Sequence, residues 1–245
     1  MSLVKFASAS IDERGRAKGG KAGDQTGREV KKQDYYVHSK GWRVFRPISN
    51  EVAEKIANDA EWAANNKHIG YDQGERQTLY KAASLVGFDC SKVTTPCETD
   101  CSALVRVCLA YAGISVPASF RTSNEGKYLL ETGKFIELSD NKYTKSSNYL
   151  RRGDILCTKT QGHTVIVISN GKNSDEIPEA PKYVEVTAKS VNVRTAPNTT
   201  GRVLGIVFKG AKLQYQGVDD KITGWHLVVY KNQNAWITPK YTRLL

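Results

Sequence analysis

The spacing of apolar residues predicts an N-terminal part in which helices and strands are mixed. In three segments the apolar positions recur at helical intervals, and the first two follow capping residues, Ser49 or Asn50 and then Asp72. Short apolar or β-branched runs flank these segments and are typical of buried strands. We expect helices over residues 52–64, 73–86 and 103–112, and strands over 4–9, 42–45 and 164–167.

From residue 183 onward the pattern changes to short strands separated by turns. The preceding segment, 171–182, is polar and contains prolines, which is typical of an extended linker. The pattern therefore predicts an α+β domain over residues 1–170, a linker over 171–182, and a small all-β barrel over 183–245. The strands expected in the barrel are 184–186, 191–194, 203–207, 213–215, 225–229 and 235–237.

The charge is concentrated in the C-terminal part. The net charge is +11, and from Tyr183 onward nine Lys and Arg residues stand against three acids. A basic surface favours a polyanionic partner, although a basic face can also be merely solvated. No helix-turn-helix, zinc-finger or aromatic RNA-binding pattern is present, so we expect no nucleic-acid partner.

No segment predicts insertion into a membrane. The longest apolar runs, 103–112 and 165–168, fall short of the ~20 residues that span a bilayer. The first six residues lead into polar and charged ones rather than into the apolar core of a signal peptide. We therefore expect a protein that is made in the cytosol without a signal peptide. We also expect it to be a monomer.

The cysteines do not follow a metal-binding pattern. Cys90, Cys97, Cys101 and Cys108 are spaced by seven, four and seven residues, unlike the close pairs of zinc ribbons. We expect neither a metal nor a cofactor. Five cysteines, an odd number, without a disulfide framework indicate a reducing cytosol and at least one free thiol.

Cys101 is the candidate nucleophile. It follows Asp100 at the start of the third expected helix, where unpaired N–H groups and the helix dipole favour thiolate. The alternative is that Cys101 only packs in the core, which is the interpretation we give to Cys108 and Cys157 within their apolar runs.

His163 is the candidate base. It follows Gly162 and begins a β-branched run, so its ring is expected at the start of a buried strand. The glycine beside it has no side chain, so other groups can come close to the backbone there. An imidazole in that position can take the proton of a thiol. A purely structural histidine is the alternative.

Three motifs resemble those of a known family. Asp100-Cys101-Ser102 with Leu104-Val105, the Gly153-Asp154-Ile155-Leu156 run, and Gly162-His163 with Ile166-Val167 are similar to NlpC-type papain-like cysteine peptidases and the related CHAP amidohydrolases. The resemblance covers residues 70–170 and is closest to phage lysins, which carry a stretch like 22–30. It implies a papain-like fold in which Cys101 attacks an amide of peptidoglycan and His163 moves the proton.

The third catalytic residue departs from this resemblance. The family orients its histidine from a strand that follows, whereas here the run 165–168 leads directly into Ser169-Asn170-Gly171. The orienting group must then come from elsewhere, and we expect Asp24 to orient His163 or Gln25 to donate to the oxyanion. A Gly-Asp-x-x-Gly run that forms only a plain turn is the alternative.

The same resemblance implies residues that bind substrate. Asp100 and Tyr71 match positions that contact the free amine of the stem peptide, and Ser102 stands beside them. Each has a structural alternative, because Asp100 can cap the helix and Tyr71 can pack against it.

The C-terminal part resembles bacterial SH3-like domains. The resemblance lies in Val191-Asn192-Val193-Arg194, Gly224-Trp225-His226 and the 235–241 run, and it implies attachment to the cell wall. For Trp225 and Trp236 we expect core packing rather than ligand stacking.

Two hypotheses for the whole chain remain open. One is a two-domain peptidoglycan hydrolase, of the endolysin or autolysin kind, that acts at the bacterial wall. The other is a non-catalytic wall- or partner-binding module that retains the hydrolase fold. The presence of both Cys101 and His163 favours the hydrolase, since a decayed enzyme has little reason to keep the pair.

Overall fold

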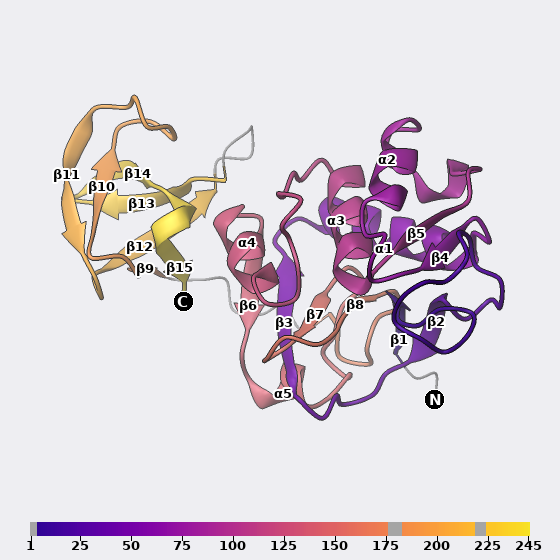
Figure 1. Cartoon of the computed structure of the whole chain (residues 1–245). Coiled ribbons are helices and arrows are strands. Elements are labelled where there is room, and N and C mark those ends of the chain that lie inside the picture. The colour runs from indigo at the N-terminus through magenta and orange to yellow at the C-terminus, as the bar shows by residue number, and fades with distance from the viewer. Residues whose placement is uncertain (1–3, 176–182, 219–223) are drawn as a thin grey trace. The chain divides into compact units, whose positions relative to one another are not determined.

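The chain forms two compact units in a computed structural model that describes residues 4–175, 183–218 and 224–245. The first unit comprises Met1–Gly126 and Leu138–Glu176, and the second comprises Lys127–Glu137 and Ile177–Leu245 (Figure 1). In the described residues no helix is both long enough and apolar enough to cross a membrane.

An antiparallel sheet carries most of the core of the first unit. The pairs β1–β2, β1–β8, β7–β8 and β3–β7 are antiparallel. Every residue of β7 and β8 is buried, which explains why their sequences are continuously apolar or β-branched. Within the first unit the strand order is β2 (Val30–Asp34), β1 (Lys5–Ala9), β8 (Thr164–Val167), β7 (Ile155–Thr158) and β3 (Trp42–Pro47).

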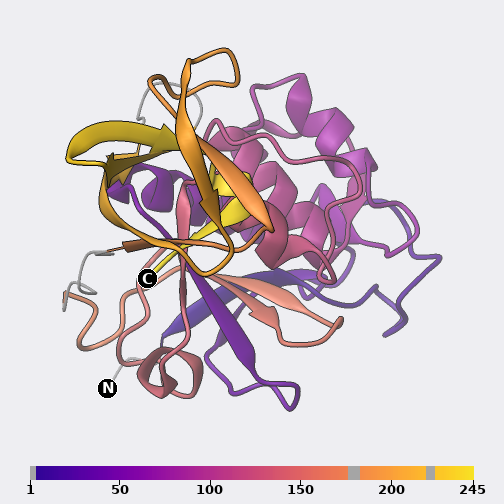
Figure 2. The ribbon, with the colours of Figure 1, turned by 90° about the vertical axis from the view of Figure 1, so that its left-hand side faces the viewer.

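Two helices pack on this sheet. Helix α1 (Asn50–Asn65) contacts β1, β2, β3 and β8, and α3 (Cys101–Tyr111) contacts β1 and β8 (Figure 2). Ser49 caps α1 through a hydrogen bond accepted from the N–H of Val52, as its place in the sequence predicts. The sequence-based expectation of helices over 52–64 and 103–112 is confirmed.

The second expected helix is much shorter than predicted. Instead of 73–86, α2 covers only Thr78–Ser84, and its N-cap is Gln77. Asp72 does not cap it, because the carboxylate accepts the N–H groups of Gly19 and Gly74 and closes a turn before the helix. Asp72 therefore ties two loops together.

Several elements of the first unit were not expected from the sequence. They are short or largely polar, so they carry too little apolar periodicity to be detected. Two of them, β4 and β5, form a separate parallel pair that leads into α3. The unexpected elements of this unit are β2, β4 (Ile69–Tyr71), the 3₁₀ helix Cys90–Lys92, β5 (Cys97–Thr99) and α5 (Asn141–Thr144). Two more unexpected elements, α4 (Glu125–Glu131) and β6 (Phe135–Leu138), have most of their residues in the second unit.

The second unit contains a seven-stranded antiparallel sheet around its own core. All six expected strands are present, and a seventh, β15, was not expected. Its core is formed mainly by valines, including Val184, Val193 and Val228, together with Ile237. The strand order is β11 (Val203–Phe208), β10 (Ser190–Arg194), β14 (Gln233–Ile237), β13 (His226–Tyr230), β12 (Lys212–Val218), β9 (Tyr183–Val186) and β15 (Thr242–Leu244).

The segment expected to be a linker begins with packed residues. Gly171 donates its N–H to the carbonyl of Leu150, Asn173 donates to Asn148, and Ser174 is only 5% exposed. Residues 171–175 therefore continue the first unit. The rest of the expected linker, 176–182, lies outside the described residues.

Candidate functional site

Cys101 lies at the first position of α3, where the sequence places it. The carboxylate of Asp100 accepts the N–H of Ala103 at 2.7 Å, which fixes the start of the helix. All five cysteines belong to the described residues, and four of them are buried; Cys101 alone is partly exposed. It is therefore the thiol that a substrate can reach.

The start of β8 brings His163 to the same place. The Cys101 thiol accepts the backbone N–H of Thr164, the residue that directly follows His163. The main chain of His163 is held by Thr158, whose Oγ1 lies 3.0 Å from the His163 nitrogen and 3.1 Å from its carbonyl oxygen. In the described residues no hydrogen bond joins the thiol to the imidazole, a separation common in free enzymes.

The acidified thiol expected at the helix start is not found. Burial raises the pKa of Cys101 to about 12, and the carboxyl groups of Asp100 and Glu125 act in the same direction. The N–H groups of Thr164 and Ser102 lower the pKa but do not offset the burial. In the free protein the thiol is therefore protonated at neutral pH.

His163 is neutral at the same pH. Burial lowers the pKa of its ring to about 4, and His38 and Lys31 add to the effect through their charge. An uncharged imidazole has a free lone pair, so it is ready to accept a proton.

Glu125 is a buried carboxyl group behind the nucleophile that the sequence analysis did not single out. Burial raises its pKa to about 8. The hydroxyl of Thr164 lies 2.6 Å from Oε1 of Glu125 and 3.0 Å from the carbonyl oxygen of Leu156. The hydroxyl thus donates to the carboxyl group of Glu125, and this hydrogen bond lowers the pKa of Glu125 but does not offset the burial.

Asp24 and Gln25 are held within their own loop. The carboxylate of Asp24 accepts the N–H groups of Thr26 and Gly27, at 3.0 and 2.6 Å. The amide of Gln25 donates to the carbonyls of Ala22 and Gly23. In the described structure neither side chain has a hydrogen bond to Cys101 or His163.

The residues expected to bind substrate do gather around Cys101. Asp100 is paired with Arg76, whose guanidinium also donates to Ser102 at 3.0 Å, and Ser102 donates to Asp100 at 2.9 Å. Tyr71 is 6% exposed, and its hydroxyl interacts electrostatically with Cys101 and Asp100. Arg76, which organises this group, was missed because nothing in the local sequence marks it.

A cleft of about 480 Å³ opens beside the nucleophile. Cys101 lines it, and so does the Gln161-Gly162 turn that leads into His163. The remaining lining residues come from the loops around the start of α3: Lys18, Gln73, Arg76, Asp100, Ser102, Arg121 and Thr122.

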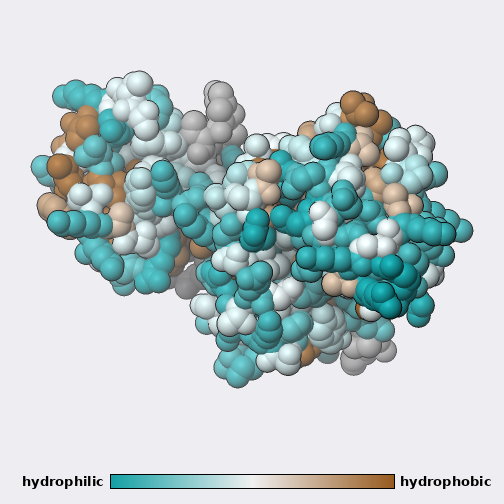
Figure 3. Space-filling view, in the orientation of Figure 1, coloured by the Kyte–Doolittle hydropathy of each residue, from teal (hydrophilic) through white to brown (hydrophobic). Residues whose placement is uncertain are grey.

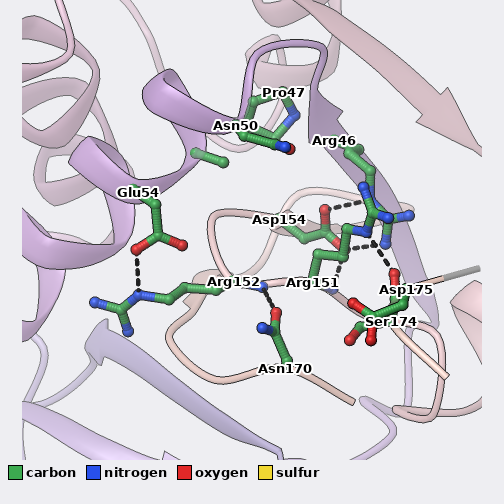
Figure 4. Close-up of a pocket in the computed structure, with 11 residues that line it drawn as sticks. Arg46, Pro47, Asn50, Glu54, Arg151, Arg152, Asp154, Asn170, Ser174 and Asp175 are labelled. Carbon is green, nitrogen blue, oxygen red and sulfur yellow. Dashed lines mark hydrogen bonds and ion pairs between the residues drawn. The ribbon is translucent and has the colours of Figure 1, made fainter. Parts of the chain in front are cut away.

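Asp154, part of the Gly-Asp motif, serves a different part of the fold. It lies just before β7, at the end opposite Thr158, and forms a buried ion pair with Arg46 at 2.7 Å. Figure 4 shows this pair in a pocket of about 250 Å³ that also contains Arg151 and Arg152. Gly153 has φ +90°, and a Cβ there would lie 2.5 Å from the backbone of Ala53, so this turn requires glycine.

The second unit has a pocket of about 340 Å³. Trp225, which is 8% exposed, lines it together with Tyr241, Arg194 and Lys240. Figure 3 shows apolar surface elsewhere on this unit, over β11, where Ile206 and Phe208 are 53% and 65% exposed. Among the described residues no three His, Cys, Asp or Glu side chains are grouped so as to hold a metal ion.

Two protein families account for the two units. The model of the endolysin-like domain family matches residues 6–174, and that of the bacterial SH3 domain matches residues 189–243. The chain therefore belongs to the endolysin-like domain family and carries a C-terminal bacterial SH3 domain. This combination is that of a peptidoglycan hydrolase that acts on the cell wall. No curated protein matches the sequence.

Proposed function

We propose that the first unit is a papain-like cysteine peptidase or amidase, related to the NlpC and CHAP enzymes, that cuts an amide in or next to the peptidoglycan stem peptide. One observation carries the proposal. The only partly exposed cysteine begins a helix packed on an antiparallel sheet, and its thiol touches the backbone next to His163.

The chemistry proceeds from a neutral pair. As the sulfur of Cys101 attacks the scissile carbonyl carbon, His163 takes the thiol proton, so a thiolate need not exist beforehand. Collapse of the tetrahedral intermediate leaves a thioester on Cys101, and His163 returns the proton to the leaving amine. Water then hydrolyses the thioester and regenerates the thiol.

The backbone supports His163 in this mechanism. Thr158 forms hydrogen bonds with both the N–H and the carbonyl of His163. These bonds fix the backbone that carries the imidazole ring. The hydrogen bonds of Asp24 and Gln25 serve their loop, so we assign these two residues to loop geometry rather than to proton transfer.

The second unit acts as the anchor. Its cationic pocket with Trp225 and Tyr241 suits an anionic wall component, and its basic excess suits the anionic wall in general. Tethering to an insoluble substrate raises the effective concentration of the first unit at that substrate.

The proposal predicts that Cys101→Ala and His163→Ala abolish lysis while the protein stays folded. Loss of turbidity of a suspension of purified walls measures lysis, and circular dichroism verifies folding. Cys97→Ala is the matched control, because this buried thiol only donates to the carbonyl of His68. Wild-type lysis by either folded site variant would exclude the mechanism and favour a non-catalytic binding module.

A further inference from the structure

The cleft beside Cys101 is positively charged. Three basic side chains line it, Lys18, Arg76 and Arg121, and only one acidic side chain, Asp100. Arg76 pairs with Asp100, so these two charges cancel. The cleft therefore carries the charges of Lys18 and Arg121 without compensation.

Both uncompensated groups are available to a ligand. Arg121 is exposed; its Nε donates to the carbonyl of Ser119 at 3.3 Å, and its backbone N–H donates to Asn124. Lys18 is also exposed and only its carbonyl is used, by Arg14. Among the described residues neither Lys18 nor Arg121 forms an ion pair.

Asp100 is poorly placed to bind a free amine. One of its oxygens accepts Ser102 and the N–H of Ala103, and the other accepts Arg76. The carboxylate is thus largely occupied and neutralised, and an ammonium group that approached it would meet Lys18 and Arg121 in the same cleft. Electrostatics disfavours a cationic group here and favours an anionic one.

We propose that this cleft selects peptides carrying a free carboxylate near the scissile amide, with Arg121 and Lys18 as the specificity-determining residues. The proposal rests on the function proposed above and specifies its substrate. Arginine suits the role because its planar guanidinium can bind a carboxylate with two parallel hydrogen bonds, and lysine adds a mobile point charge.

Two carboxylates of a wall peptide have this chemistry: that of an acidic residue within the peptide and that at its C-terminus. The test compares soluble muropeptides, prepared from purified wall with a glycosidase, before and after carbodiimide coupling to ammonia. Synthetic peptides amidated at only one of the two positions identify which carboxylate is recognised. Release of new amino groups gives kcat/KM for each substrate.

We expect amidation to lower kcat/KM of the wild-type protein about tenfold, the size of one good charge-assisted contact at a partly exposed site. In Arg121→Gln and Lys18→Gln the preference for the free carboxylate shrinks, because the variant loses activity mainly on the unmodified substrate. Arg202→Gln is the matched control, since it removes one exposed positive charge from the second unit and should keep the full preference.

The possible outcomes separate this proposal from the function on which it rests. Equal cleavage of untreated and amidated muropeptides would overturn the carboxylate selectivity and leave the hydrolase intact. An unchanged preference in both cleft variants would show that other residues read the carboxylate. Failure to release amines from untreated muropeptides would contradict the hydrolase itself.

Discussion

At the residue scale, the site combines a protonated thiol with a neutral imidazole. Burial produces both states, since it raises the pKa of Cys101 and lowers that of His163. The motif around each residue was visible in the sequence, and so was the start of α3. The protonation states were not, because they depend above all on burial, which only the fold produces.

Glu125 predicts how activity depends on pH. Its pKa is raised to about 8, so the group is neutral below that pH and becomes a carboxylate above it. The new negative charge raises the pKa of Cys101 further, so kcat/KM should fall as the pH rises through about 8.

Glu125→Gln tests this dependence, because glutamine stays neutral and its side-chain oxygen can still accept the hydrogen bond of Thr164. We expect the variant to lose the alkaline fall while keeping activity at pH 7. Glu131→Gln, on the same helix, is the matched control and should keep the wild-type profile. The same alkaline fall in Glu125→Gln would assign it to another group.

At the element scale, periodicity predicted the long elements and missed the short ones. α1 and α3 present apolar faces to the sheet, so their apolar residues recur clearly at helical intervals in the sequence. β2, with the sequence VKKQD, and the short β4, β5 and α4 carry no such pattern. α2 was overestimated because the hydrogen bonds of Asp72 to Gly19 and Gly74 start a turn where the sequence shows a good cap.

The link between β3 and β7 depends on a buried ion pair. Arg46 and Asp154 are 4% and 0% exposed at their side chains, and they join the end of β3 to the start of β7. Asp154→Asn leaves a buried guanidinium without its counter-charge, which costs about 3–5 kcal/mol of unfolding free energy.

Urea denaturation measures this loss, and Asp34→Asn provides the comparison. Asp34 pairs with Lys5 on the surface, where both side chains are about half exposed, so its loss should cost less than about 1 kcal/mol. Equal destabilisation by the two variants would mean that the buried pair does not stabilise this end of the sheet.

At the scale of the whole molecule, the sequence separates an α+β part from an all-β part. The pattern changes from mixed to strand-only at residue 183, and the two family models match residues 6–174 and 189–243. The grouping of Lys127–Glu137 with the second unit was beyond prediction, because it depends on contacts between distant parts of the chain.

Deletion of residues 183–245 should remove attachment more than chemistry. We expect much weaker lysis of intact walls and near-normal cleavage of soluble muropeptides, because only the insoluble substrate benefits from a tether. Binding of the full chain to sedimented walls should also fall as salt rises, since screening weakens exposed charges. A deletion variant that sediments with walls as fully as the intact chain, at low and high salt, would contradict the anchoring role.

The central claim is that Cys101 cuts an amide of peptidoglycan. Mass spectrometry of the fragments released from purified wall by the wild-type protein and by folded Cys101→Ala tests it most directly. We expect fragments with new amino and carboxyl ends at one amide bond from the wild type, and none from the variant. The same fragments from Cys101→Ala, or fragments that end in a newly cut sugar, would contradict it.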